Sequence, residues 1–181
     1  MDLIDRNLKA LEGMKTGDLI FFYPRSFNLF AKTILFVTNQ HYHHGAIVLD
    51  AENVIEADLN LGVHTSKIST YLNDYELDLF RLKDPIGTQL IPEEAKKFLG
   101  YGYDLGNVVW AGLEFIWFRI TGLAMFRKFK NPYDEKNEVE SEEYIDLVYR
   151  NCGISLRPDI HPTDVTAQDL ADSPLLCKVN S

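Results

Sequence analysis

The stretch Ser141-Glu142-Glu143-Tyr144-Ile145-Asp146-Leu147-Val148-Tyr149 has the apolar spacing of an amphipathic helix that begins at or beside Ser141. Serine is among the best helix N-caps, so the simplest role of Ser141 is to cap this helix. The N-terminus of a helix also lowers the pKa of a thiol and presents backbone N–H groups to a developing oxyanion. The position therefore suits a nucleophile as well, and the spacing alone leaves both roles open.

The chain before this helix predicts an α+β fold, a small antiparallel sheet packed with helices. Turn residues separate short apolar runs, which we expect to form strands at 18–23, ending before Pro24, and at 45–49, 54–57, 62–64 and 75–82. Helical spacing predicts helices over 2–13 and 26–37, a short helix starting at Pro92 and a last helical turn at 166–170.

Residues 105–126 are almost continuously apolar and long enough to span a bilayer. Glu114 and Arg119 interrupt the segment, and each costs roughly 2.5–3.5 kcal/mol at a membrane centre, which argues against a span. We expect an apolar helical insertion at about 105–130 that forms a core helix or a protein contact, with a membrane-surface contact as the alternative.

Length and charge limit the classes of protein further. A chain of 181 residues with 46% hydrophobic and 25% charged residues fits a single domain over 1–181. Its net charge of −9 argues against a nucleic-acid partner. Two cysteines cannot build a disulfide framework, and the first residues lack the features of a signal peptide, so we expect a cytoplasmic location, with virion or envelope association as the alternative.

Three side chains could form a nucleophile, a base and a group that orients the base: Ser141, His43 and Glu56. His41 and His43 would share a strand face, which allows a metal site, but no spacing typical of metal ligands supplies the further ligands, and we expect neither metal nor cofactor. His64 and His161 have no evident partners and are expected at the surface. Cys152, near the end of the helix, is expected to be a small buried hydrophobe.

Six short stretches, in this order, resemble the circularly permuted NlpC-like papain-fold hydrolases of the YiiX type. They are Gly17-Asp18-Leu19-Ile20, His43-His44-Gly45-Ala46-Ile47-Val48, Val54-Ile55-Glu56-Ala57, Tyr101-Gly102-Tyr103-Asp104, Ser141-Glu142-Glu143-Tyr144-Ile145 and Asp169-Leu170-Ala171-Asp172-Ser173-Pro174-Leu175-Leu176. The resemblance covers nearly the whole chain and implies a permuted papain-like fold.

The resemblance also implies roles for single residues. The histidine that stands two residues before the glycine is the base, which is His43, and Glu56 is the residue that orients it. In the family's Cys-Ser-Glu pattern Ser141 stands at the nucleophilic cysteine, Glu142 at the serine and Glu143 at the glutamate. Tyr103, Asp18 and Glu143 are the candidates for binding substrate or an oxyanion.

The implied function is that of a thiol peptidase or amidase, which cleaves amide bonds of small or cell-wall peptides through an acyl-enzyme. Serine at position 141 makes the chain either an engineered inactive form or a natural pseudoenzyme. Two alternatives remain: a lipid acyl hydrolase or acyltransferase like the lecithin:retinol acyltransferase branch, and a non-catalytic binding or assembly module of a phage particle or envelope complex.

Overall fold

A six-stranded antiparallel sheet is the centre of the fold in the computed structural model, which describes residues 2–25, 41–103 and 138–180. In space the strands follow the order β4-β3-β2-β1-β5-β8, and each neighbouring pair is antiparallel. Their bounds are β1 Leu19–Pro24, β2 His44–Val48, β3 Asn53–Asp58, β4 Gly62–Lys67, β5 Tyr75–Leu82 and β8 Leu176–Lys178. The predicted α+β class with an antiparallel sheet is confirmed.

Both faces of the sheet are apolar, because side chains of β1, β2, β3 and β5 alternate between two buried clusters. One cluster contains Leu19, Phe21, Ile47, Ile55 and Ala57. The other contains Ile20, Phe22, Ala46, Val48 and Val54. The sheet is therefore covered on both sides.

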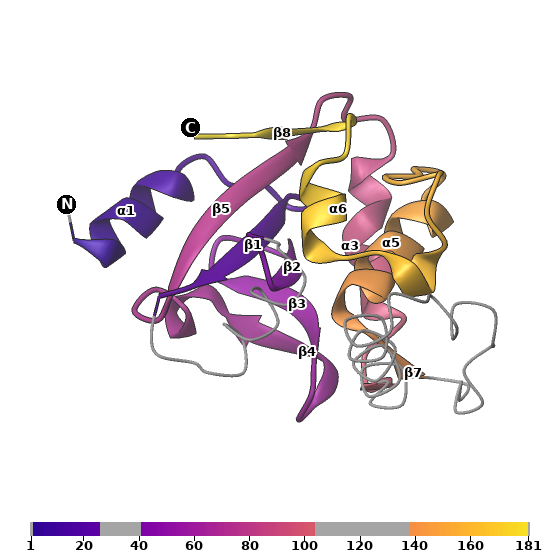
Figure 1. Ribbon diagram of the computed structural model, residues 1–181, viewed down its shortest axis with the longest axis horizontal. Coiled ribbons are helices and arrows are strands. Elements are labelled where there is room, and N and C mark those ends of the chain that lie inside the picture. Colours follow the sequence, from indigo (N-terminus) through magenta and orange to yellow (C-terminus); the bar gives the residue numbers. More distant parts are fainter. Residues whose placement is uncertain (1, 26–40, 104–137, 181) are drawn as a thin grey trace, which may run out of the picture.

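Helices cover these two faces unequally (Figure 1). Three lie on one side of the sheet and complete the first cluster: α3 Ile91–Lys96, α5 Ser141–Asn151 and α6 Ala167–Ala171. On the other side lies α1 Leu3–Ala10, whose buried Asn7 bonds to backbone groups of Leu72, Tyr75 and Leu77. The described residues also form three short 3₁₀ turns, η1 Ile68–Thr70, η2 Thr88–Leu90 and η3 Pro162–Asp164.

A second, two-stranded sheet leads directly into α5. Strand β6 Gly102–Tyr103 pairs in parallel with β7 Glu138–Val139, with Tyr103 opposite Val139. Since α5 begins two residues after β7 ends, this pairing brings Tyr103 to the first turn of the helix.

The structure confirms several predicted elements and adds others. Strand β5 has the predicted bounds, whereas β4 continues to Lys67 and α1 ends at Ala10, before the predicted end at residue 13. Strands β6, β7 and β8 were not predicted. The expected helix at 26–37 and the apolar segment 105–126 lie outside the described residues.

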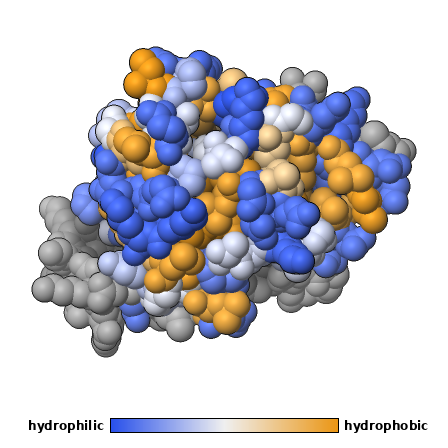
Figure 2. Space-filling model, turned by 180° about the vertical axis from the view of Figure 1, so that it is seen from behind, coloured by the Kyte–Doolittle hydropathy of each residue, from blue (hydrophilic) through white to orange (hydrophobic). Residues whose placement is uncertain are grey.

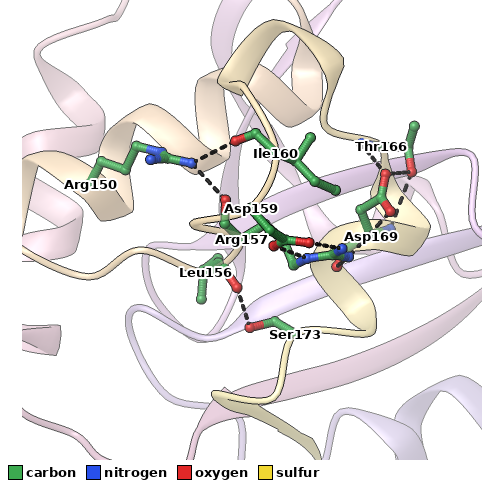
Figure 3. A network of polar contacts seen from close by, with 8 residues as sticks. All are labelled: Arg150, Leu156, Arg157, Asp159, Ile160, Thr166, Asp169 and Ser173. Atoms are coloured by element: carbon green, nitrogen blue, oxygen red, sulfur yellow. Dashed lines mark hydrogen bonds and ion pairs between the residues drawn. The ribbon is translucent and has the colours of Figure 1, made fainter.

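A network of polar side chains holds the loop after α5 against the helix (Figure 3). From the last turn of α5, Arg150 donates to the carbonyl oxygens of Arg157 and Ile160, and its Nε lies 2.5 Å from Oδ2 of the fully buried Asp146. Further contacts join Arg157 to Asp159 and Asp169, Thr166 to Asp169, and Ser173 to the carbonyl of Leu156. The loop is thus fixed mainly by arginines.

Replacing Arg150 with alanine is expected to lower the free energy of unfolding by about 2–3 kcal/mol at neutral pH, because Asp146 loses its cation and two carbonyls lose their donor. Burial already raises the pKa of Asp146, and Arg150 acts against that rise. Without the arginine this pKa rises further, so folded Arg150→Ala takes up a proton on Asp146 as pH falls. Its loss of stability relative to wild type therefore becomes smaller at low pH.

Urea unfolding at about pH 7 and about pH 4 measures this difference. The control is Lys97→Ala, which removes the cation of an exposed pair with Glu94 and is expected to cost under about 0.5 kcal/mol. A deficit of Arg150→Ala that is the same at both pH values would contradict an unpaired Asp146 as its cause.

Candidate active site

Helix α5 begins at Ser141, but its cap is Glu140. Glu140 has the extended backbone of an N-cap, and its N–H donates to Oε2 of Glu143 at 3.3 Å, one half of a reciprocal capping box. The interpretation of Ser141 as the cap is therefore wrong, because the capping position is one residue earlier. Glu143, a candidate for substrate binding, is engaged in closing the helix end.

Ser141 is 3% exposed, and its side chain lies between two polar neighbours. Its hydroxyl donates to Oε2 of Glu142 at 2.5 Å. The hydroxyl of Tyr103 lies in hydrogen-bonding range of the Ser141 side chain and backbone. Burial, followed by the charges of Glu142 and Glu140, raises the pKa of Tyr103 above its usual value, so the phenol keeps its proton. Tyr103, a candidate for binding substrate or an oxyanion, thus lies beside Ser141.

His44, and not His43, pairs with Glu56. Nε2 of His44 lies 2.7 Å from Oε2 of Glu56, and Glu56 is 1% exposed. Tyr71 donates to the second oxygen of the same carboxylate. Both carboxylate oxygens are therefore engaged, and Glu56 is fixed in place between β2, β3 and the turn that carries Tyr71.

The expected pair of His43 with Glu56 is corrected by this geometry. His43 precedes β2, so strand alternation does not govern where it points. Its Nδ1 bonds to the carbonyl of Phe22 at 2.9 Å, and its ring stacks on Tyr75 with centroids 5.4 Å apart. Burial, followed by the charge of His44, lowers the pKa of His43 to about 4. His43 is thus neutral near pH 7 and is held away from Glu56.

The pKa shifts of His44 and Glu56 favour the ionic form of the pair. Burial alone would lower the pKa of His44, but the hydrogen bond to Glu56 and the charges of Glu56, Glu142 and Asp58 outweigh it and raise this pKa. Burial would likewise raise the pKa of Glu56, yet the bonds from His44, Ser66 and Tyr71 lower it to about 2. Both shifts favour the ionised pair, an imidazolium on a carboxylate.

Glu142 interacts with both Ser141 and His44. Burial raises its pKa, while the positive charge of His44 and the hydrogen bond from Ser141 act in the opposite direction. Its Oε1 is buried and has no hydrogen-bond partner among the described residues. The buried carboxyl therefore has one oxygen on Ser141 and one oxygen not bonded within the described ranges.

His64 was expected at the surface, and the structure places it beside the buried carboxylate instead. It stands directly opposite Glu56 in the β3–β4 ladder, with Nε2 3.8 Å from Oε1 of Glu56 and 2.9 Å from Oγ of Ser66. The alternation of residues 62, 64 and 66 could have indicated this, had the strand been extended past residue 64.

Two other candidates have structural roles. Asp18 accepts two hydrogen bonds from Arg81, at 2.8 and 2.7 Å, and one from the Lys15 N–H. It lies next to Tyr149, in the last turns of α5, so the structure does not bring it to Ser141. Cys152 is the C-cap of α5 and is only partly buried, and burial raises the pKa of its thiol.

The described residues contain no group of three or more histidine, cysteine or acidic side chains placed to hold a metal ion. His41, the other half of the expected metal pair, stacks on Tyr23. None of the helices within the described ranges combines the length and apolarity that crossing a membrane requires. On the face opposite that of Figure 1, apolar and hydrophilic residues are interspersed over the described surface (Figure 2).

Comparison with protein-family models and with curated proteins finds no match to this chain.

Proposed function

We propose that this chain is a hydrolase-type domain of permuted papain-like fold that acts on amide bonds of small or cell-wall peptides, with residue 141 as the acylation site. The observation that carries the proposal is the placement of a buried Ser141 in the first turn of α5, in contact with Tyr103 and Glu142 and beside an ionic pair of His44 with Glu56.

This placement suits attack on a carbonyl group. The backbone N–H groups in the first turn of a helix have no helical partners and carry the positive end of its dipole, which favours a developing oxyanion. The Tyr103 phenol is a second donor at the same point, since its raised pKa keeps it protonated. A tetrahedral intermediate on residue 141 would therefore have donors close to its oxygen.

The charge state of His44 predicts different reactivity for a cysteine and for a serine at position 141. An imidazolium stabilises a neighbouring thiolate, which is how papain-like sites activate cysteine. A serine gains nothing from a cation, because its hydroxyl stays protonated until a base removes the proton during attack. We therefore expect slow acylation of Ser141 and faster acylation of a thiol there.

The substrate class follows from charge. Glu140, Glu142 and Glu143 place three acidic side chains in or next to the first turn, in a chain whose net charge is −9. Such a site attracts a cationic group and repels an anionic one. A peptide with a free side-chain amine, as in cell-wall stem peptides, fits this better than a phospholipid headgroup of negative charge.

Restoring the family pattern with Ser141→Cys/Glu142→Ser is expected to create a thiol that iodoacetamide alkylates at least about tenfold faster than Cys152 and Cys177 in the same molecule. The natural cysteines serve as internal controls, since one has a raised pKa and the other is exposed. Mass spectrometry of tryptic peptides gives the three rates, and incubation with cell-wall stem peptides tests amide cleavage.

A residue-141 thiol no more reactive than Cys177, together with intact stem peptides, would contradict the proposal. In that case a binding or assembly module becomes the better account of the fold.

A further inference from the structure

We propose that Glu142, rather than a histidine, accepts the proton of Ser141 when the serine attacks, so that the chain uses a serine–carboxylate pair. This inference rests on the function proposed above, and it turns the site from an incomplete thiol hydrolase into a slow serine hydrolase.

The hydrogen bonds carry the inference. The Ser141 hydroxyl donates to Oε2 of Glu142 at 2.5 Å, which already directs the proton towards the carboxylate. Neither neighbouring histidine is bonded to Ser141 in the described part of the chain: His43 uses Nδ1 on the Phe22 carbonyl, and His44 uses Nε2 on Glu56. In the ionised form that its raised pKa favours, His44 also has no lone pair with which to accept a proton.

Two departures from the family's pattern then offset each other. Ser141 in place of cysteine removes a group that can ionise near neutral pH, and Glu142 in place of serine adds a carboxylate at hydrogen-bonding distance from it. A carboxyl whose pKa is raised by burial is a stronger base than an exposed one, and this is the direction found for Glu142.

The groups around Glu142 set the pH at which it can act. His44 from β2 and the bonded Ser141 act directly on Glu142, whose own charge acts on Tyr103 from β6. Glu56 and Asp58 from β3 act in turn on His44, and Glu140 acts on Tyr103. Of these, His44 is the cation, and Glu56 keeps it charged. We assign both as positioning residues that hold Glu142 ionised without touching the substrate.

Each step balances without a further reactant. As Oγ of Ser141 forms a bond to the carbonyl carbon, its proton moves to Oε2 of Glu142. The same proton then passes to the leaving amine as the C–N bond breaks, which yields an acyl-serine and an ionised Glu142. Water attacks the ester, gives one proton to Glu142, and this proton returns to Oγ as the acid leaves.

The test is the rate at which an uncharged alkyl fluorophosphonate labels Ser141, followed by intact-protein and peptide mass spectrometry. Glu142→Gln keeps the shape of the side chain and removes the base, so it is expected to slow labelling about a hundredfold or more. Glu93→Gln, which removes an equal charge from an exposed glutamate, is the control and should label at the wild-type rate.

The pH profile separates a proton acceptor from a structural side chain. Wild-type labelling is expected to rise with pH through a single step above the ordinary pKa of glutamic acid, because burial raises that of Glu142. His44→Gln removes the cation that favours the ionised form, so the step should move to higher pH. A step that disappears in His44→Gln but survives in Glu142→Gln would overturn the inference in favour of a histidine base.

The failure of this inference is distinguishable from that of the proposed function. Iodoacetamide should alkylate Ser141→Cys with or without Glu142→Gln, since a thiolate needs no carboxylate base. The serine–carboxylate pair alone would be refuted if Ser141→Cys reacted with iodoacetamide both with and without Glu142→Gln, while the fluorophosphonate labelled wild type and Glu142→Gln equally. The same conclusion would follow if the thiols reacted and the fluorophosphonate labelled neither of these two proteins. Unreactive thiols in both would refute the acylation site itself.

Discussion

Glu56→Gln is expected to lower the free energy of unfolding by about 3 kcal/mol near pH 5.5, and by less at lower and higher pH. The fall of the Glu56 pKa from 4.5 to about 2 corresponds to about 3 kcal/mol of stability at a pH where the carboxylate is ionised in both states. Glutamine keeps the volume of the side chain but cannot neutralise His44, which would be left as a buried cation or lose its proton.

The dependence on pH follows from the two pKa shifts. The Glu56 pKa is lowered on folding, so its contribution is present above 4.5 and is lost as pH falls towards about 2. The His44 pKa is raised on folding, so its contribution is full below 6.5 and is lost as pH rises through the higher folded value. The pair is therefore strongest between 4.5 and 6.5.

Denaturant unfolding of wild type and Glu56→Gln at about pH 3, 5.5 and 8.5 measures this window, with Glu93→Gln as the exposed control. A difference between the two proteins that is constant over this range would show that the contact of His44 with Glu56 is not ionic. Fluorophosphonate labelling near neutral pH should also slow, because an uncharged His44 no longer favours the ionised form of Glu142.

Gly62→Ala is expected to cost about 3–4 kcal/mol of stability and to abolish labelling of Ser141. Gly62 has a φ of +66°, and a β-carbon there would lie 2.0 Å from the backbone oxygen of Tyr101. The collision cannot be relieved by turning a side chain, so the backbone at 101–102 must move. Because Tyr103 follows directly, its phenol would leave Ser141.

Gly13→Ala is the matched control for this variant. Gly13 also has a positive φ, +73°, but a β-carbon there would meet nothing within 4 Å. Gly13→Ala should therefore cost only about 1 kcal/mol of stability, which is the cost of a positive φ in a residue that has a β-carbon. Thermal and urea unfolding of both variants, with labelling of Ser141, isolates the effect of the collision. Equal losses for Gly62→Ala and Gly13→Ala would mean that Tyr101 yields freely and does not position Tyr103.

Local sequence signals predicted much of the secondary structure. The leucine and aromatic run of β5 and the helical spacing from Ser141 each placed an element correctly, because a buried strand or helix face requires apolar residues at positions that the sequence shows. Strands of two or three residues, such as β6 and β8, have no period to detect, and only their partners determine them.

The site was harder to predict because it depends on register and on position relative to an element's end. His43 and His44 are adjacent, and the choice between them depends on where β2 starts. The strand begins at His44, so His43 lies outside its alternation and His44 lies within it, on Glu56. The capping box of Glu140 with Glu143 uses a glutamate as N-cap, which is not among the preferred caps, so Ser141 seemed the better choice. Asp18 stands before a strand in a family-like motif, yet Arg81, distant in sequence, determines its role.

The pairing of β6 with β7 has a consequence for how this protein can diverge. The two strands are hydrogen-bonded neighbours although 34 residues, 104–137, separate them in the sequence, so the two ends of this stretch are held side by side. Lengthening a connection whose ends are already fixed in this way costs little free energy. Evolution can thus rebuild this stretch for a new partner or habitat while Tyr103 and Ser141 keep their positions, and a laboratory graft at the same junction has the same freedom.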